Sequence, residues 1–320
     1  MLWVCASCGL LRPAPRRNPA LPKGADAPGA VFIRDSLFMD EAEVANIHWL
    51  EYMHFLRTDS SEAVYRAAKP DTAVWHQLSW NDPYVAYYLR YPGFRYFPVV
   101  GITLTQAEAY CRWRTAKVAE SLRTKPEYRR WRRQLRDYDV QIIYRLPTAA
   151  EWELAAGGGL DSAQYPYGYQ HPRRVSKYNR ITSRPVCAHP LELPAKARVY
   201  RNHATVREQF YYQTALGQPL VYFHCDSLPL ANQPVVLNDG VLITEYVYAH
   251  PPNGYGLFNL IGNVAELTTT PGQAKGGSFE HPMAACRPNL YQAYDGPQEW
   301  LGFRCACTIR VRRKAAPPGK

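Results

Sequence analysis

The stretch "KGGSFEHPMAACRPNLYQAYDGPQEWLGFRCA", residues 275–306, decides how this chain is to be understood. It contains a Gly-Gly-Ser turn, a cysteine eight residues after the serine, and a closing Gly-Phe-Arg-Cys segment. Consecutive glycines indicate a tight turn, because glycine adopts backbone conformations that other residues avoid. The pattern raises the question whether Cys286 is a catalytic thiol or part of a scaffold from which the chemistry has been lost.

Upstream of this stretch, residues 30–56 predict a short strand followed by a helix that opens near Asp40. The apolar residues of this helix recur at three-residue steps along one face, which is the spacing of an amphipathic helix. These residues are Val44, Ile47, Leu50, Met53 and Leu56.

Two further segments repeat the order of a strand and then a helix. "PVVG" predicts a buried strand, and Gln106–Thr124 predicts an amphipathic helix with Thr105 as its N-cap. "QIIYRLPTAAEWELAAGGG" predicts a strand, a short helix capped by Thr148, and an end at the glycines. The fold class that follows is α+β.

After Tyr169 the sequence becomes irregular, with many Pro, Tyr, Asn and His residues. A segment of this kind is more typical of an elaborated surface than of a second domain. We therefore predict one domain over residues 30–313 with an irregular insertion at about 170–232. A leader precedes it at 1–29, and a basic tail follows at 314–320.

The net charge of +11 sits largely in "RPAPRR", "RTKPEYRRWRRQLRD" and "IRVRRK". No helix-turn-helix, zinc-finger or RNA-binding signature accompanies these segments, so a nucleic-acid partner is not predicted. A solvated basic face is the plainer interpretation, and contact with an anionic membrane or envelope polymer is the functional alternative. No run of 18 apolar residues occurs that would predict a membrane-spanning helix.

The N-terminus "MLWVCASC" is apolar and places small residues directly before Cys8. This resembles the end of a bacterial lipoprotein signal, in which Cys8 would be the lipidated residue. The apolar part is shorter than a normal signal, and Cys5 stands at the position three residues before Cys8, where leucine is usual. A start codon assigned too late would explain the length, and a cytoplasmic N-terminus with two incidental thiols is the alternative. Only Cys5 and Cys8 form a CxxC, so a structural zinc site is not predicted.

Four motifs occur in the order found in the formylglycine-generating enzyme, or sulfatase-modifying factor, family, which the chain resembles. They are "RLPTAAEWELAA" (145–156), "PPNGYGLFNLIGNVAEL" (251–267), "KGGSF" (275–279) and "LGFRCA" (301–306). The resemblance extends from about residue 30 to 310, except for the irregular region. It implies an elaborated C-type-lectin-like fold with little regular secondary structure.

Within the family, "VANIHWLEY" and "PDTAVWHQLSWNDPYVAYYLRYPGFRYFPVVG" resemble the gliding-motility and type IX secretion lipoproteins. This likeness favours lipidation at Cys8. It implies an exported, membrane-anchored lipoprotein of the bacterial cell envelope, in the periplasm or outer membrane, with envelope proteins as partners.

Active members of the family hold copper(I) between two cysteine thiolates that lie five residues apart, shortly after the Gly-Gly-Ser turn. Counted forward from Gly276, the two places are His281 and Cys286; counted back from Gly302, Cys286 matches a later structural cysteine. Neither register contains two cysteines, so copper is not predicted, because one thiolate holds this soft ion loosely. Ser278, His281 and Cys286 remain the candidates for chemistry, and Cys286 is predicted to be a buried, inert thiol.

The resemblance also implies a calcium site in "LFNLIGNVAEL". The matching ligands are the Asn259 side chain, the Gly262 and Val264 carbonyls and the Glu266 carboxylate, and such hard oxygen donors suit calcium. A metal-free turn held by hydrogen bonds is the alternative. The tryptophans that flank this glutamate in active members are replaced by Ala265 and Leu267, as in an eroded catalytic pocket.

A family disulfide matches Cys111 and Cys305, and it would join the long helix to the last strand. Two buried thiols are the alternative. Cys187, Cys225 and Cys307 receive no assignment.

Three functions compete. The leading hypothesis is a non-catalytic envelope lipoprotein that acts by protein–protein contact, in gliding motility or type IX secretion. The second is a formylglycine-generating oxidase that acts on a protein cysteine through a variant metal site at His281 and Cys286. The third is an iron enzyme of the kind that joins sulfur to histidine derivatives. It ranks last, because such enzymes have an extra helical domain with an HxxxE-type motif, and these 320 residues do not predict one.

Overall fold

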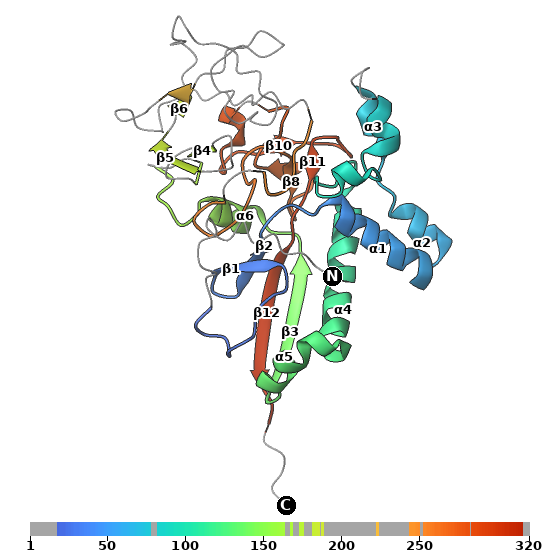
Figure 1. Ribbon diagram of the computed structural model, residues 1–320, viewed down its shortest axis with the longest axis vertical. Helices are drawn as coiled ribbons and strands as arrows, with labels where there is room; N and C mark the ends of the chain where they lie inside the picture. The colour runs from blue at the N-terminus through green and yellow to red at the C-terminus, as the bar shows by residue number, and fades with distance from the viewer. Residues whose placement is uncertain are drawn as a thin grey trace, which may run out of the picture.

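A four-stranded antiparallel sheet runs along the long axis of the molecule (Figure 1), in the order β1-β2-β12-β3. Its strands are β1 Ala30–Arg34, β2 Leu37–Asp40, β3 Tyr138–Arg145 and β12 Ala306–Arg313. The computed structural model describes residues 18–77, 82–163, 167–168, 173–175, 181–185, 187–188, 222–223, 243–249, 252–281 and 283–315.

Strand β12 is the centre of this sheet because it pairs with β2 on one side and along its whole length with β3 on the other. Its first half is buried, whereas Arg310, Arg312 and Arg313 at its far end are exposed. The sheet therefore has a buried half beside the functional site and a solvated half at the opposite end of the molecule.

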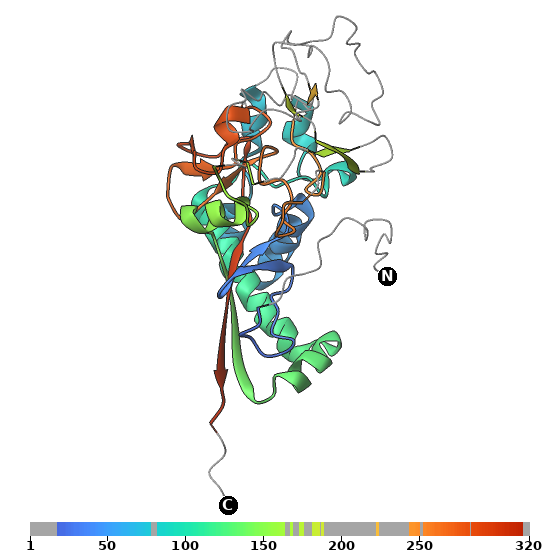
Figure 2. The same cartoon turned by 90° about the vertical axis from the view of Figure 1, so that its left-hand side faces the viewer.

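Helix α4, Leu104–Thr124, lies beside β3 and β12 in both views (Figures 1 and 2). It begins after Thr103, so the prediction of Thr105 as N-cap is wrong. Thr103 Oγ1 accepts from the Gln106 N–H at 3.1 Å, and Gln106 Oε1 accepts from the Thr103 N–H at 2.7 Å. This reciprocal capping box satisfies two backbone donors, which a start at Thr105 would not do.

Helix α1, Asn46–Asp59, also begins later than predicted, because β2 continues to Asp40 and the chain then turns before the helix. Its buried apolar face contains Trp49, Tyr52, Met53 and Leu56. Trp49 stacks on Tyr110 of α4 with ring centroids 5.5 Å apart, an arrangement that contributes about 0.5–1.5 kcal/mol beyond simple burial.

Two predicted strands take a different form. The "PVVG" segment is buried, but it forms a single bridge, Ala45 to Pro98, rather than a strand. The closing strand is divided into β11, Leu301–Gly302, and β12. The chain between them bonds elsewhere: the Phe303 carbonyl accepts from Val44, and the Cys305 carbonyl accepts from Asp40.

A second sheet, in the order β10-β9-β8-β11, lies above the first in Figure 1. Its strands are short, and β11 pairs with β8 in parallel. They are β8 Ala265–Leu267, β9 Gln273–Lys275, β10 Gln292–Ala293 and β11. Helix α6, Ala149–Ala156, is capped by Thr148 as predicted, and its Trp152 is fully buried.

The remaining elements are short helices and strands around these two sheets. They are α2 Glu62–Ala67, η2 Thr72–Gln77, α3 Asp82–Tyr87, η3 Pro92–Phe94, η4 Pro126–Tyr128, α5 Arg129–Gln134, η7 Met283–Cys286, β4 Arg173–Val175, β5 Ile181–Pro185, β6 Cys187–Ala188 and β7 Tyr222–Phe223. Among the described helices, none combines the length and apolarity that crossing a bilayer demands.

Residues 18–29, expected as part of a flexible leader, pack on the domain instead. Ala25 and Ala27 are buried, and Leu21 contacts the main core. Cys8 and most of the 170–232 insertion lie outside the described residues.

Candidate functional site

The Gly-Gly-Ser turn follows β9 and holds the candidate residues together. Gly276 and Gly277 adopt φ values of +91° and +66°, in the region that favours glycine. A Cβ at Gly277 would lie 2.2 Å from the Cys286 Sγ, and one at Gly276 would lie 3.0 Å from the Trp152 ring. The two glycines are therefore required for the close approach of η7 and α6 to this turn.

Cys286 is buried as predicted, with 2% of its surface exposed. Burial raises the pKa of its thiol to about 12, although hydrogen bonds with the backbone of Gly262 and Ser278 oppose the shift. At neutral pH the sulfur is therefore a protonated thiol, whereas both nucleophilic attack and metal binding use the thiolate.

His281 faces Ser278 rather than the thiol. The Ser278 Oγ lies 2.7 Å from His281 Nδ1, and the imidazole edge packs on Trp300 with ring centroids 4.9 Å apart. Cys286 contacts the His281 backbone carbonyl, at 3.9 Å, rather than its ring. Burial lowers the pKa of His281, so its ring is neutral at pH 7.

These contacts test whether the residues fit copper(I). Copper(I) in this family is held by two thiolates, whereas the turn offers one sulfur, and the His281 ring contacts Ser278 rather than Cys286. Within the described part of the chain, no group of three or more His, Cys, Asp or Glu side chains is placed to hold a metal ion. The donor set at this turn does not fit copper, and we derive no chemistry through it.

Two carboxyl groups lie beside the turn. Glu299 is 2% exposed, and its Oε2 has no hydrogen-bond partner among the described residues. The pKa of Glu280 is raised to about 7. The main cause is partial burial, and the charge of Glu299 and a hydrogen bond with Glu299 add to it. The two carboxyl groups therefore share a proton near neutral pH. Two adjacent carboxyl groups do so wherever they meet, so this proton is not evidence of catalysis.

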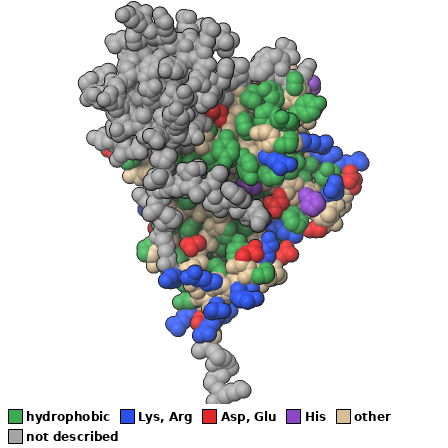
Figure 3. Space-filling model, in the orientation of Figure 1, with side chains coloured by type: hydrophobic (Ala, Val, Ile, Leu, Met, Phe, Trp, Pro, Cys, Tyr) green, Lys and Arg blue, Asp and Glu red, His purple; other side chains and the backbone are tan. Residues whose placement is uncertain are grey.

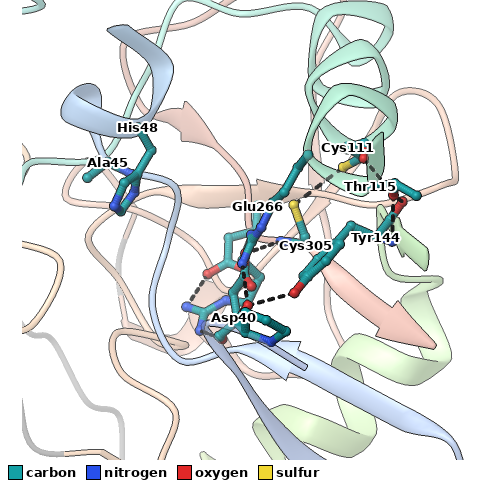
Figure 4. Close-up of polar contacts among 11 residues, drawn as sticks. Asp40, Ala45, His48, Cys111, Thr115, Tyr144, Glu266 and Cys305 are labelled. Atoms are coloured by element: carbon teal, nitrogen blue, oxygen red, sulfur yellow. Dashed lines mark hydrogen bonds and ion pairs between the residues drawn. The ribbon is translucent and has the colours of Figure 1, made fainter. Parts of the chain in front are cut away.

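Glu266 of the predicted calcium loop is bound by protein groups (Figure 4). Arg304 Nε and Nη2 donate to its two oxygens at 2.7 and 2.6 Å, and Trp152 Nε1 donates at 2.7 Å. Glu266 and Arg304 are each 0% exposed. Arg304 also donates to the carbonyls of Asp40 and Phe258, so this ion pair joins both sheets and the predicted calcium loop.

Asn259 and its neighbours form a second buried polar group. Asn259 Nδ2 and Asn263 Nδ2 donate to Glu43, at 3.4 and 2.9 Å. Burial raises the pKa of Glu43 to about 8, against the opposing charge of Arg304. Asn259 Oδ1 is buried and has no hydrogen-bond partner among the described residues.

Asn259 in this loop suits calcium binding, whereas Glu266 is already bonded to Arg304. The unpartnered Asn259 Oδ1 is an oxygen that a cation would satisfy, and no atom lies within 4 Å of a Cβ position at Gly262, which leaves space beside the loop. Glu266, however, would have to be shared with Arg304. The calcium assignment to Asn259, Gly262, Val264 and Glu266 stays a prediction.

Cys111 and Cys305 are brought together as the sequence led us to expect (Figure 4). Their sulfur atoms lie 3.4 Å apart, and both residues are buried. This separation is a thiol contact, longer than the roughly 2.05 Å of a disulfide bond. The covalent bridge therefore stays a prediction, although its two residues adjoin.

Glu43, Glu299 and the role of Arg304 were missed by reasoning from the sequence. Arg304 carried a signal, because an arginine inside the apolar "LGFRCA" segment must find a partner on burial. Glu43 and Glu299 carried none, because acidic residues in irregular segments are usually exposed.

The chain is similar to a family model and to curated proteins described as formylglycine-generating enzymes. Residues 18–309 match the Sulfatase-modifying factor enzyme 1-like domain. The formylglycine-generating enzyme of Thermomonospora curvata is 30% identical over 194 residues, which cover 51% of this chain and 48% of that protein. The inactive C-alpha-formylglycine-generating enzyme 2 of Bos taurus is 25% identical over 242 residues, which cover 70% and 53%.

Among solved structures, the Treponema denticola variable protein 1 is similar, with 17% identity, a TM-score of 0.43, and coverage of 85% of this chain and 84% of that one. The chain spans about half the length of the curated relatives that it matches. Because the domain match covers most of the chain, the protein belongs to the sulfatase-modifying factor enzyme 1-like family, with its α+β fold.

Proposed function

We propose that this protein is a non-catalytic member of its family, an envelope lipoprotein that acts by protein–protein contact. The observation that carries the proposal is the state of Cys286: a buried thiol whose pKa is raised to about 12, with His281 in the place where the family resemblance puts a second cysteine. A relative described as inactive matches over 70% of the chain, which supports the same conclusion.

Gliding motility or type IX secretion is the setting that we propose, from the sequence resemblance in residues 44–52 and 70–101. Exposed tyrosines support a contact function, because tyrosine is enriched in protein interfaces. Tyr96 and Tyr246 are 50% and 43% exposed, and their rings lie 5.9 Å apart. Hydrophobic side chains also gather on the face shown in Figure 3.

An oxidase assay tests the non-catalytic proposal. The protein is incubated with copper(I), oxygen and a cysteine-containing peptide, and the peptide is analysed by mass spectrometry for the aldehyde. We expect no aldehyde, whereas the Thermomonospora curvata enzyme in the same assay should produce it. Copper-dependent aldehyde formation above the peptide-only background would overturn the proposal.

The second candidate is a formylglycine-generating oxidase with a variant metal site at His281 and Cys286. It rests on the sequence resemblance, which counted forward from Gly276 puts His281 and Cys286 at the places of the two cysteines. If activity is found, Cys286→Ser and His281→Ala should each abolish it. Unchanged activity in both variants would exclude this mechanism.

Membrane anchoring through Cys8 and export to the envelope belong to the same proposal. Cells are labelled with an alkyne-bearing palmitate analogue, and the wild-type chain is compared with Cys8→Ser and with Cys5→Ser as the matched control. We expect labelling to disappear in Cys8→Ser alone. Equal labelling in all three forms would remove Cys8 as the anchor.

We also propose calcium as the structural ion of the Asn259 loop. Bound there, it would supply positive charge for the unpartnered Asn259 Oδ1 and hold the loop in place. No step of any reaction is assigned to it.

A further inference from the structure

One end of the molecule carries most of its net charge. Residues 123–139 and 310–314, here called the basic tip, contain eleven Lys and Arg side chains against three carboxylates, a balance of +8. The whole chain has a net charge of +11. Two basic segments that lie far apart in the sequence are therefore brought together by the fold at one place.

The fold builds the tip from separate elements. The end of α4, with η4 and α5, meets the far ends of β3 and β12, where Arg313 pairs with Tyr138 in the sheet register. These elements share the narrow end of the molecule in two perpendicular views (Figures 1 and 2), and Lys and Arg side chains gather there in Figure 3.

The cations of the tip are accessible and largely without anionic partners. Ten of the eleven are exposed, namely Arg123, Lys125, Arg129, Arg130, Arg133, Arg136, Arg310, Arg312, Arg313 and Lys314. Arg136 pairs with the adjacent Asp137, at 3.5 Å; among the described residues no other tip cation forms an ion pair with a carboxylate. Like charges clustered on one surface repel one another, and a bound polyanion would relieve that repulsion.

The tip lacks the features that other polyanions use. None of the large hydrophobic side chains exposed in the described part of the chain belongs to the tip. Single-stranded nucleic acid is bound by stacking its bases on exposed aromatic rings, and protein interfaces place apolar residues at their centres. A protruding surface whose exposed side chains are mainly cationic suits a flat array of anionic groups, which attracts cations without requiring a pocket.

We propose that the basic tip binds the anionic headgroups of a phospholipid membrane. The contact is peripheral and electrostatic: the guanidinium and ammonium groups neutralise lipid phosphates, and no side chain enters the hydrocarbon. It is independent of acylation at Cys8 and of any activity at Cys286.

The test measures co-sedimentation of the full chain with vesicles. One set contains phosphatidylglycerol mixed with phosphatidylcholine, and the other contains phosphatidylcholine alone. The tip variant carries Arg130→Gln, Arg133→Gln, Arg312→Gln and Arg313→Gln. The control variant carries Arg57→Gln, Lys69→Gln, Arg90→Gln and Arg95→Gln, which removes the same charge from exposed positions elsewhere.

We expect wild type and control to bind the phosphatidylglycerol vesicles and the tip variant to bind more than about tenfold more weakly. Rising salt should release the bound protein, because exposed charges are screened over about 10 Å at 0.1 M. Circular dichroism of both variants confirms that they are folded.

Three results would overturn the proposal. Equal weakening in both variants would assign binding to net charge rather than to the tip. Equal binding to uncharged vesicles would assign it to apolar contact. Displacement from the vesicles by duplex DNA at matched phosphate concentration would make nucleic acid the better ligand of this surface.

Discussion

Arg304 and Glu266 form a two-bond ion pair at a point in the protein where both residues are 0% exposed. The pair lies between the predicted calcium loop, the four-stranded sheet and Trp152 of α6, and every one of these elements contributes a hydrogen bond to it. Removing one member leaves the other charge buried without its partner, which is more costly than losing the attraction between them.

Glu266→Ala should therefore lower the free energy of unfolding by about 3–5 kcal/mol. Urea unfolding followed by tryptophan fluorescence measures the change. Glu62→Ala is the matched control, because Glu62 pairs with Arg66 at the surface, where both side chains are mostly exposed; it should cost less than about 1 kcal/mol. Similar losses in both variants would mean that the buried pair does not organise the fold.

Cys111 and Cys305 should form a disulfide when the folded protein is oxidised, because a small movement closes their 3.4 Å separation. The bond would raise the free energy of unfolding by about 2–5 kcal/mol, since it closes a long loop in the unfolded chain. Peptide mapping of non-reduced protein should find the Cys111–Cys305 cross-link. Cys305→Ala should abolish it, whereas Cys307→Ala should leave it intact. Fully oxidised, folded protein without this cross-link would contradict the prediction.

The elements that could be predicted from the sequence are those whose ends are marked by residues close together in the chain. The helix with Thr148 as its cap could be identified because its Thr-x-x-Glu pattern names both partners of a capping box. The start of α4 was misplaced by two residues because Thr103 and Thr105 both suit an N-cap, and Gln106 alone decides between them. The start of α1 depends on bonds from Asn46 and Ile47 to carbonyls at Phe97 and Arg95, which no local pattern announces.

The candidate site likewise contains contacts that could be predicted from the sequence and contacts that could not. The proximity of Cys111 and Cys305 followed from the family resemblance, and so did the burial of Cys286. The contact between Glu43 and Asn259 joins residues 216 positions apart. Such a long-range polar pair depends on how the loops cross in the folded chain, and a single sequence does not contain that information.

Glu43 should make stability depend on pH. Burial raises the pKa of its carboxyl group from 4.5 to about 8, so the folded state keeps a proton that the unfolded state releases. The contribution of Glu43 to the free energy of unfolding is therefore complete below about pH 4.5, and it is lost as the pH rises towards 8. In chelator-treated protein, Glu43→Gln should remove this decline, on the order of a few kcal/mol across the window.

The measurement for Glu43 is urea unfolding at a series of pH values, with Glu51→Gln as the control. Glu51 is exposed on α1, and its replacement should leave the pH profile unchanged. A wild-type profile that rises between pH 5 and 8, and that Glu43→Gln does not alter, would show that this carboxyl group is ionised in the folded protein.

Calcium should raise the unfolding temperature of chelator-treated protein, because a ligand that binds the folded state alone stabilises it by mass action. Differential scanning calorimetry with and without saturating calcium measures the shift. Asn259→Leu should abolish it by removing Oδ1, whereas Asn253→Leu, in the neighbouring turn, should destabilise the protein and keep the shift. An unchanged unfolding temperature on adding calcium would remove the site.

Cys286 should resist alkylation in the folded protein, because its thiol is both buried and protonated. With a pKa of about 12, roughly one thiol in ten thousand is ionised at pH 8, and the thiolate is the reacting species. Iodoacetamide is added to native protein and to protein in urea, and the modification of each cysteine is quantified by peptide mass spectrometry. We expect Cys286 to be modified only after unfolding. Fast modification of Cys286 in the native protein would reveal an accessible thiolate beside Ser278 and His281. The oxidase would then be the preferred function for this protein.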